Sequence, residues 1–238
     1  MGGRSWRPRI RWVGDCALEV AVGPQRADLG SVARAQRVGA ALLAAALPGV
    51  QDVVPGMRTV LVILERTRPL DDPGRIRALV RQVADQAAGE VRRAPASDPP
   101  ARVVVIPVRY GGEDGPDLED VACETQLAAA EVVARHQASE YTVLALGFRP
   151  GFAFLGLLDP TLAVPRRASP RTLVPAGSVG VAGRQTGVYP CDAPGGWRLL
   201  GRTSVRLFDP AAATARDACL LRPGDLVQFV ADPAGSVR

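Results

Sequence analysis

The stretch that decides the fold runs from Leu146 to Thr203 and reads GFRPGFAFL (147–155), PAGSVGVAG (175–183), QTGVYP (185–190) and PGGWRLLGRT (194–203). Glycine permits positive φ and close backbone approach, and proline fixes turns. Short apolar segments between such residues predict strands joined by tight turns, which is typical of a β-barrel or sandwich. So many special backbone positions also indicate a shaped site, and we expect any activity to reside here.

Outward from this stretch, the C-terminal half contains further apolar segments of strand length. A glycine-rich and acidic loop follows the first of them, and Asp114 or Asp117 is placed to cap a short helix. We expect one further helix over 128–137 and short strands over 103–108, 141–146, 178–182, 187–189, 197–200 and 226–230. This half therefore predicts a mainly β domain.

The N-terminal half has a different pattern. Apolar strands are expected at 17–22 and 59–64. Helices are expected at 31–47, with Ser31 as N-cap, and at 75–88, after Pro73 and Gly74. The order strand, helix, strand, helix predicts a small α+β domain. RRAPASDPP at 92–100 is typical of an exposed linker, which predicts domains at 1–94 and 101–238.

Composition narrows the class of protein. The 238 residues are 47% hydrophobic and 22% charged, as in ordinary globular proteins. No apolar run reaches the roughly 20 residues of a membrane helix, and the first residues lack the apolar region of a signal peptide. We therefore expect a cytoplasmic protein with no membrane partner. The cysteines, at positions 16, 123, 191 and 219, lack the close spacing that is typical of metal ligands, so no metal site is expected.

All 29 basic residues are arginine, since the sequence contains no lysine. The chain consequently has no P-loop lysine, no Schiff-base lysine and no lysine general base. The net charge is +5, but the arginines are scattered among acidic residues, without a basic tail. We therefore expect no nucleic-acid partner.

Two groups of residues are candidates for chemistry. Arg166, Arg167 and Arg171 stand within six positions, and guanidinium groups suit carboxylate and phosphate ligands. The alternative is that each only pairs with a surface acid. His136 is the only histidine, so it is the first candidate for general acid or base, although a lone histidine near a helix end is often a packed residue. We assign His136 and Arg166 to catalysis.

Several polar residues in the glycine-rich stretch are candidates for substrate binding. Gln185, Thr186 and Tyr189 could orient a small amide through neutral hydrogen bonds, or could form a hairpin edge. Ser178 lies in a PAGS turn that it could order, and Arg202 closes the last motif. Together with Arg167 and Arg171, these complete the predicted binding set.

The C-terminal half contains, in this order, DLEDVA, a lone histidine before YTVLALGFRPGF, PRR, PR, PAGSVGVAG, QTGVYP and PGGWRLLGRT. This order resembles the KipI family, also called the 5-oxoprolinase B subunit or allophanate hydrolase subunit 1 (carboxyltransferase subdomain C and D). The resemblance is dense over 110–209 and looser in the first domain, through GDCALEV and VVPGMRTVLV. It implies an N-terminal α+β domain followed by a cyclophilin-like β-barrel.

The same resemblance implies a heteromeric ATP-dependent 5-oxoprolinase that opens 5-oxoproline to glutamate. The implied partners are a related barrel protein (the 5-oxoprolinase C subunit, or allophanate hydrolase subunit 2) and a separate 5-oxoprolinase A subunit. ATP would be required by the complex while this chain binds no cofactor, and the chain alone would be inactive. Two alternatives remain open: an inhibitor that binds a histidine kinase, and a carboxyltransferase or allophanate-type protein that acts on urea-derived substrates.

Overall fold

The computed structural model describes residues 7–24, 29–65, 73–90 and 102–232. It comprises two compact units, Met1–Pro99 and Pro100–Arg238, each described below by itself. The predicted linker at 92–100 lies outside the described residues, so the domain boundaries of 1–94 and 101–238 stay predictions. No described helix is long and apolar enough to cross a membrane.

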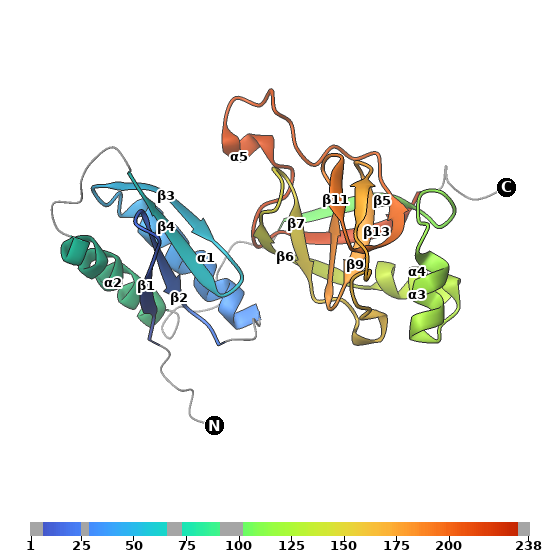
Figure 1. The fold of residues 1–238 in the computed structure, drawn as a ribbon, viewed down its shortest axis with the longest axis horizontal. Coiled ribbons are helices and arrows are strands. Elements are labelled where there is room, and N and C mark those ends of the chain that lie inside the picture. Colours follow the sequence, from blue (N-terminus) through green and yellow to red (C-terminus); the bar gives the residue numbers. More distant parts are fainter. Residues whose placement is uncertain (1–6, 25–28, 66–72, 91–101, 233–238) are drawn as a thin grey trace. The chain divides into compact units, whose positions relative to one another are not determined.

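The first unit is a four-stranded antiparallel sheet with two helices (Figure 1). The sheet order is β1-β2-β4-β3. Along β4, every second residue is buried, and these residues share one core with the apolar faces of both helices. The elements are β1 (Arg9–Val13), β2 (Ala17–Ala21), α1 (Leu29–Ala44), β3 (Val50–Pro55), β4 (Thr59–Leu64) and α2 (Pro73–Glu90).

Two predictions for this unit need correction. Ser31 is not the N-cap, because α1 begins at Leu29 and places Ser31 inside the helix, fully buried. The expected order also lacked β1 and β3. In β1, arginines alternate with apolar residues, and β3 carries Asp52 and ends at Pro55, so neither is a continuous apolar run.

The second unit is a closed seven-stranded barrel in the order β10-β7-β6-β13-β5-β12-β9 (Figure 1). Its strands are β5 (Val103–Tyr110), β6 (Glu140–Leu146), β7 (Ala153–Gly156), β9 (Ser178–Ala182), β10 (Gln185–Val188), β12 (Arg198–Arg202) and β13 (Leu226–Ala231). The last strand, β13, lies between the first two, parallel to β5 and antiparallel to β6. The predicted mainly β character of this half is confirmed.

Besides the barrel strands, the second unit contains short strands and helices. A two-stranded ribbon pairs β8 (Arg171–Val174) with β11 (Ala193–Gly195), and helices α3 (Leu118–Thr125) and α4 (Ala129–Ala138) pack against each other. A 3-10 turn, η1 (Pro160–Leu162), and the short helix α5 (Ala215–Ala218) complete the unit. The predicted helix at 128–137 matches α4 to within one residue, whereas β7, β8 and β11 were not expected.

Candidate anion-binding site

Asp117 organises the site from the start of α3. It occupies the N-cap position, yet its side chain makes no capping hydrogen bond. Its Oδ1 accepts hydrogen bonds from Arg167 Nη1 and Arg171 Nη2, each at 2.8 Å. Its Oδ2 accepts from Arg171 Nη1 at 2.8 Å and from the backbone N–H of Leu199 at 2.7 Å. A carboxylate that is only 1% exposed therefore fixes both arginines.

Electrostatics keep this carboxylate ionised. Burial by itself would raise the pKa of Asp117, but the hydrogen bonds from Arg171 and Leu199 and the charges of Arg171 and Arg167 outweigh it and hold that pKa below its usual value. The same hydrogen bond raises the pKa of Arg171. The ion pairs are therefore permanent near neutral pH. Asp114, the other expected cap, pairs instead with Arg109 at 2.8 Å.

Tyr189 packs against a glycine turn near these arginines. The Tyr189 hydroxyl accepts a hydrogen bond from the backbone N–H of Trp197, and a Cβ on Gly195 would collide with that hydroxyl. The carbonyl of Gly196 accepts from the backbone N–H of Arg167 at 2.8 Å. Glycine at 195 is thus required because it is the one residue that leaves room for the tyrosine.

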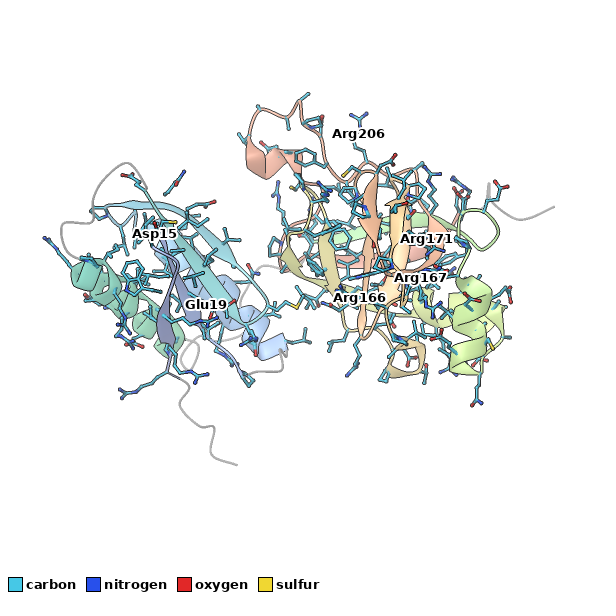
Figure 2. All side chains as sticks on the ribbon, in the orientation of Figure 1. Asp15, Glu19, Arg166, Arg167, Arg171 and Arg206 are labelled. Carbon is cyan, nitrogen blue, oxygen red and sulfur yellow. The ribbon has the colours of Figure 1, made fainter. Side chains whose placement is uncertain are left out.

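Arg166 completes the group that we call the Asp117 cluster: Asp117, Arg166, Arg167, Arg171 and Tyr189. Arg166 is exposed and has no ion pair among the described residues, and its charge together with that of Arg171 acts on Tyr189. Figure 2 shows the three arginines gathered on one part of the barrel. The three arginines and one carboxylate of the cluster leave a surplus of two positive charges, which favours an anionic ligand.

The cluster also contains an unsatisfied donor. Arg167 Nε is buried and has no hydrogen-bond partner within the described part of the chain. A buried donor without a partner costs about 1–3 kcal/mol. Arg198 nearby is neutralised by Asp120 and Glu124, so it does not add to the surplus charge. The surplus charge of the cluster suits a carboxylate or phosphate oxygen.

His136 lies elsewhere, in the barrel core, and is fully buried. Its Nδ1 is 2.8 Å from the Tyr110 hydroxyl and its Nε2 is 2.9 Å from Thr186 Oγ1. Thr186 Oγ1 donates its own proton to the carbonyl of Gly180 at 3.0 Å, so it accepts from a protonated Nε2, and Nδ1 accepts from Tyr110. We call these four residues the His136 network.

The network holds its histidine neutral. Burial lowers the pKa of His136 to about 3, and the ring stacks on Phe229 with centroids 4.6 Å apart. Because both nitrogens are occupied and the ring has no exposed surface, His136 cannot touch a substrate in this structure. The expectation of a catalytic His136 is corrected to that of a buried structural residue.

The Asp117 cluster and the His136 network both lie in a chain whose sequence matches one known protein family. The carboxyltransferase domain, subdomain C and D, matches residues 8–220. The chain belongs to this family. It is 42% identical over 229 residues to the 5-oxoprolinase B subunit of Escherichia coli O157:H7, covering 96% of this chain and 98% of that protein. The resemblance seen in the sequence is confirmed.

Solved structures share the fold of this chain. TTHA0988 superposes with a TM-score of 0.73 at 38% identity, covering 94% of this chain and 40% of that one. The chain thus spans about two fifths of that longer protein. The urea amidolyase of K. lactis gives a TM-score of 0.77 at 19% identity, covering 98% of this chain and 15% of that chain. At that identity the likeness shows the fold alone.

Within this carboxyltransferase-domain chain, the other predicted site residues are dispersed. Ser178 and Thr186 are 2% and 0% exposed, so neither offers a surface to a ligand, contrary to expectation. Gln185 is half-buried in β10, next to Thr186. Arg202 lines a separate pocket with Arg109. The structure brings together only the three arginines and Tyr189 from the predicted set.

One functional residue was missed by the sequence reasoning. Asp117 was expected to cap α3, because an aspartate directly before a helix usually does so. Its partners Arg167 and Arg171 are 50 and 54 positions away, a separation at which a single sequence shows no pairing. The only available signal was that DLEDVA and the PRR and PR segments belong to the same family pattern.

Proposed function

We propose that this chain is the B subunit of an ATP-dependent 5-oxoprolinase, which opens 5-oxo-L-proline to L-glutamate. The proposal is supported by the identity to a protein of that name over nearly the whole of both chains. The single structural observation that carries it is the surplus of positive charge around Asp117, held on a rigid barrel. The substrate is a small anion, since its carboxylate is ionised at neutral pH.

The Asp117 cluster would bind and orient that carboxylate. Asp117 fixes Arg167 and Arg171, while exposed Arg166 is available to the ligand. Tyr189 lies within the electrostatic reach of Arg166 and Arg171, beside the glycine turn. A carboxylate placed against these donors would hold the lactam ring in a fixed position. We assign ligand binding to Arg166, Arg167 and Arg171, while Tyr189, only 2% exposed, supports the glycine turn beside them.

The cluster itself has no group that titrates near neutral pH. The pKa of Asp117 is lowered, that of Arg171 is raised, and burial raises the pKa of Tyr189. Proton transfer would therefore come from elsewhere in a complex. This division of labour supports the expectation that the isolated chain is inactive and acts with a separate A subunit and a related barrel protein.

The chemistry needs an activated amide, because a five-membered lactam resists hydrolysis. In the proposed reaction, ATP phosphorylates the lactam oxygen and ADP leaves. One water then adds to the ring carbon, the carbon–nitrogen bond breaks to give the free amine and an acyl phosphate, and a second water hydrolyses the acyl phosphate and releases phosphate. The products are glutamate, ADP and phosphate. A chain without lysine has no P-loop to hold ATP, so one of the partner proteins would bind it, in the cytoplasm where ATP is available. The two-domain organisation and a cyclophilin-like barrel belong to this proposal.

The test is ATP-dependent glutamate release by the chain reconstituted with its two partner proteins. Arg166→Gln is expected to raise KM for 5-oxoproline by about tenfold or more, because it removes a charged hydrogen bond. Arg184→Gln, an exposed arginine in the turn between β9 and β10, is the matched control and should leave KM unchanged. Turnover by the purified chain alone, or no turnover by the assembled complex, would contradict the proposal.

A further inference from the structure

A second basic cavity lies in the barrel unit, apart from the Asp117 cluster. Its volume is about 520 Å³, and Arg109, Arg202 and Arg206 line it together with Gly177, Thr203 and Ser204. Figure 2 places Arg206 away from Arg166, Arg167 and Arg171. None of the residues of the Asp117 cluster lines this cavity. Cavities of this size hold small-molecule ligands.

Arg202 is the best-placed donor in the cavity. Its Nε donates to the carbonyl of Ala176 at 2.9 Å, which fixes the plane of the guanidinium group. No carboxylate lies within 4 Å of it among the described residues. Its two Nη groups have no acceptor in the described part of the protein. Arg202 thus combines a fixed position with free charge and free donors.

A close backbone contact builds the wall beside Arg202. Gly177 has φ of +82°, and a Cβ there would collide with the carbonyl oxygen of Thr203. The backbone N–H of Thr203 donates to the carbonyl of Gly177 at 2.9 Å. Glycine is required at 177 on both grounds, since only it accepts this φ and this approach. The loop from Thr203 is consequently held against the 175–177 turn.

That loop lines the cavity and carries further hydrogen-bond donors. Thr203 Oγ1 accepts from the backbone N–H of Val205 at 3.2 Å, which orders the turn. The backbone N–H groups of Ser204 and Arg206 find no acceptor among the residues described. The Arg206 guanidinium is 76% exposed and only 3.8 Å from Asp209, so that ion pair neutralises little of its charge.

Arg109 contributes less than the other two arginines. Asp114 pairs with it at 2.8 Å and Asp232 lies 3.8 Å from it, and neither carboxylate lines the cavity. The usable positive charge is therefore that of Arg202 and Arg206. These two guanidinium groups and two backbone N–H groups are more donors than the two oxygens of a carboxylate require, but they match the oxygens of a phosphate.

We propose that this cavity is a second anion site, which binds the phosphate group of a small molecule through Arg202, Arg206 and the 204–206 backbone. The site stands on its own geometry and does not depend on the 5-oxoprolinase proposal. Free phosphate and the phosphates of a nucleotide share this chemistry, and the experiment separates them.

The test is isothermal titration calorimetry on the purified full chain with inorganic phosphate, ADP and 5-oxoproline. Arg202→Gln and Arg206→Gln are each expected to weaken phosphate or ADP binding by about tenfold. Arg184→Gln is the exposed control. Arg206→Gln is the variant that keeps the test valid if Arg202→Gln fails to fold, because the Arg206 side chain is 76% exposed and its one ion pair with a described residue is the 3.8 Å contact with Asp209.

Each outcome decides the proposal. Saturable binding that both cavity variants weaken supports it; tighter binding of ADP identifies a nucleotide, and equal binding identifies the phosphate group itself. Absence of saturable phosphate or ADP binding overturns it. If Arg166→Gln weakens binding and the cavity variants do not, the ligand binds at the Asp117 cluster. If 5-oxoproline binds more tightly than phosphate or ADP and Arg202→Gln weakens that binding, the cavity is a carboxylate site. Both overturn the phosphate assignment.

Discussion

The His136 network and the Asp117 cluster are two polar groups of one barrel that use opposite strategies. In the network, the polar side-chain atoms have partners, no charge is present, and His136 and Thr186 are fully buried. In the cluster, charges exceed their compensation, and Arg167 Nε is left without a partner among the described residues. A closed, neutral arrangement stabilises a core, whereas an open, charged one is prepared for a ligand.

Removal of the network should have the largest effect on stability. His136→Ala deletes a fully buried ring and removes one hydrogen-bond partner each from the Tyr110 and Thr186 hydroxyls, so we expect a loss of about 4 kcal/mol in the free energy of unfolding. Urea denaturation measures it. The control is Glu131→Gln, an exposed change on the same helix α4, with an expected effect of less than about 0.5 kcal/mol. Equal effects of the two variants would show that the network is not structural.

Disruption of the cluster at its centre should cost somewhat less. Asp117→Asn leaves Arg167 and Arg171 without their counter-charge, but both arginines retain some contact with solvent. We expect a loss of about 3 kcal/mol in the free energy of unfolding, at the lower end for a broken buried ion pair. Asp120→Asn, an exposed acid in α3, is the matched control. If thermal unfolding shifts equally in both variants, Asp117 does not organise the site.

The two regions should also differ in their response to pH. The pKa of His136 is lowered in the folded state to about 3, so between about pH 6.5 and 3 the unfolded chain binds a proton that the folded chain does not. The contribution of neutral His136 to the free energy of unfolding is therefore fully present above the pKa of the unfolded chain and is lost as the pH falls. The loss is about 2 kcal/mol from about pH 7.5 to about pH 5. Denaturant unfolding at both pH values measures this loss. His136→Gln should remove it, and an unchanged pH dependence in that variant would contradict the assignment.

The smallest expected effect on stability is that of Arg166. It is exposed and has no ion pair within the described ranges, so Arg166→Gln should change the free energy of unfolding by less than about 0.5 kcal/mol. Loss of ligand binding without loss of stability in Arg166→Gln would show that Arg166 serves ligand binding and not the stability of the fold. A destabilisation similar to that of Asp117→Asn would instead make it a structural member of the cluster.

The strands of the barrel could be predicted where apolar runs were bounded by glycine or proline, as at 178–182, which matches β9 to the residue. β8 and β11 could not, because β8 has exposed residues at Thr172 and Leu173 and β11 is only three residues long. Their pairing depends on contacts between distant segments. Propensity along one chain does not contain that information.

The candidate site was predictable in its charge but not in its geometry. The close spacing of Arg166, Arg167 and Arg171 predicts anion binding, and the structure brings these arginines together at one place (Figure 2). The importance given to His136 came from its pKa in water, which burial changes completely. Whether a histidine faces solvent or the core depends on which face of α4 meets the barrel, and that is decided by tertiary packing.

The place of β13 between β5 and β6 has a consequence for synthesis in the cell. The ribosome makes β5 and β6 early, but the strand that joins them is completed only at residue 231. Until then, each of the two strands presents an unpaired edge, and the barrel remains an open sheet. Closure of this unit therefore follows translation of β13, and in the interval before it the unpaired edges of β5 and β6 are open to pairing with other chains.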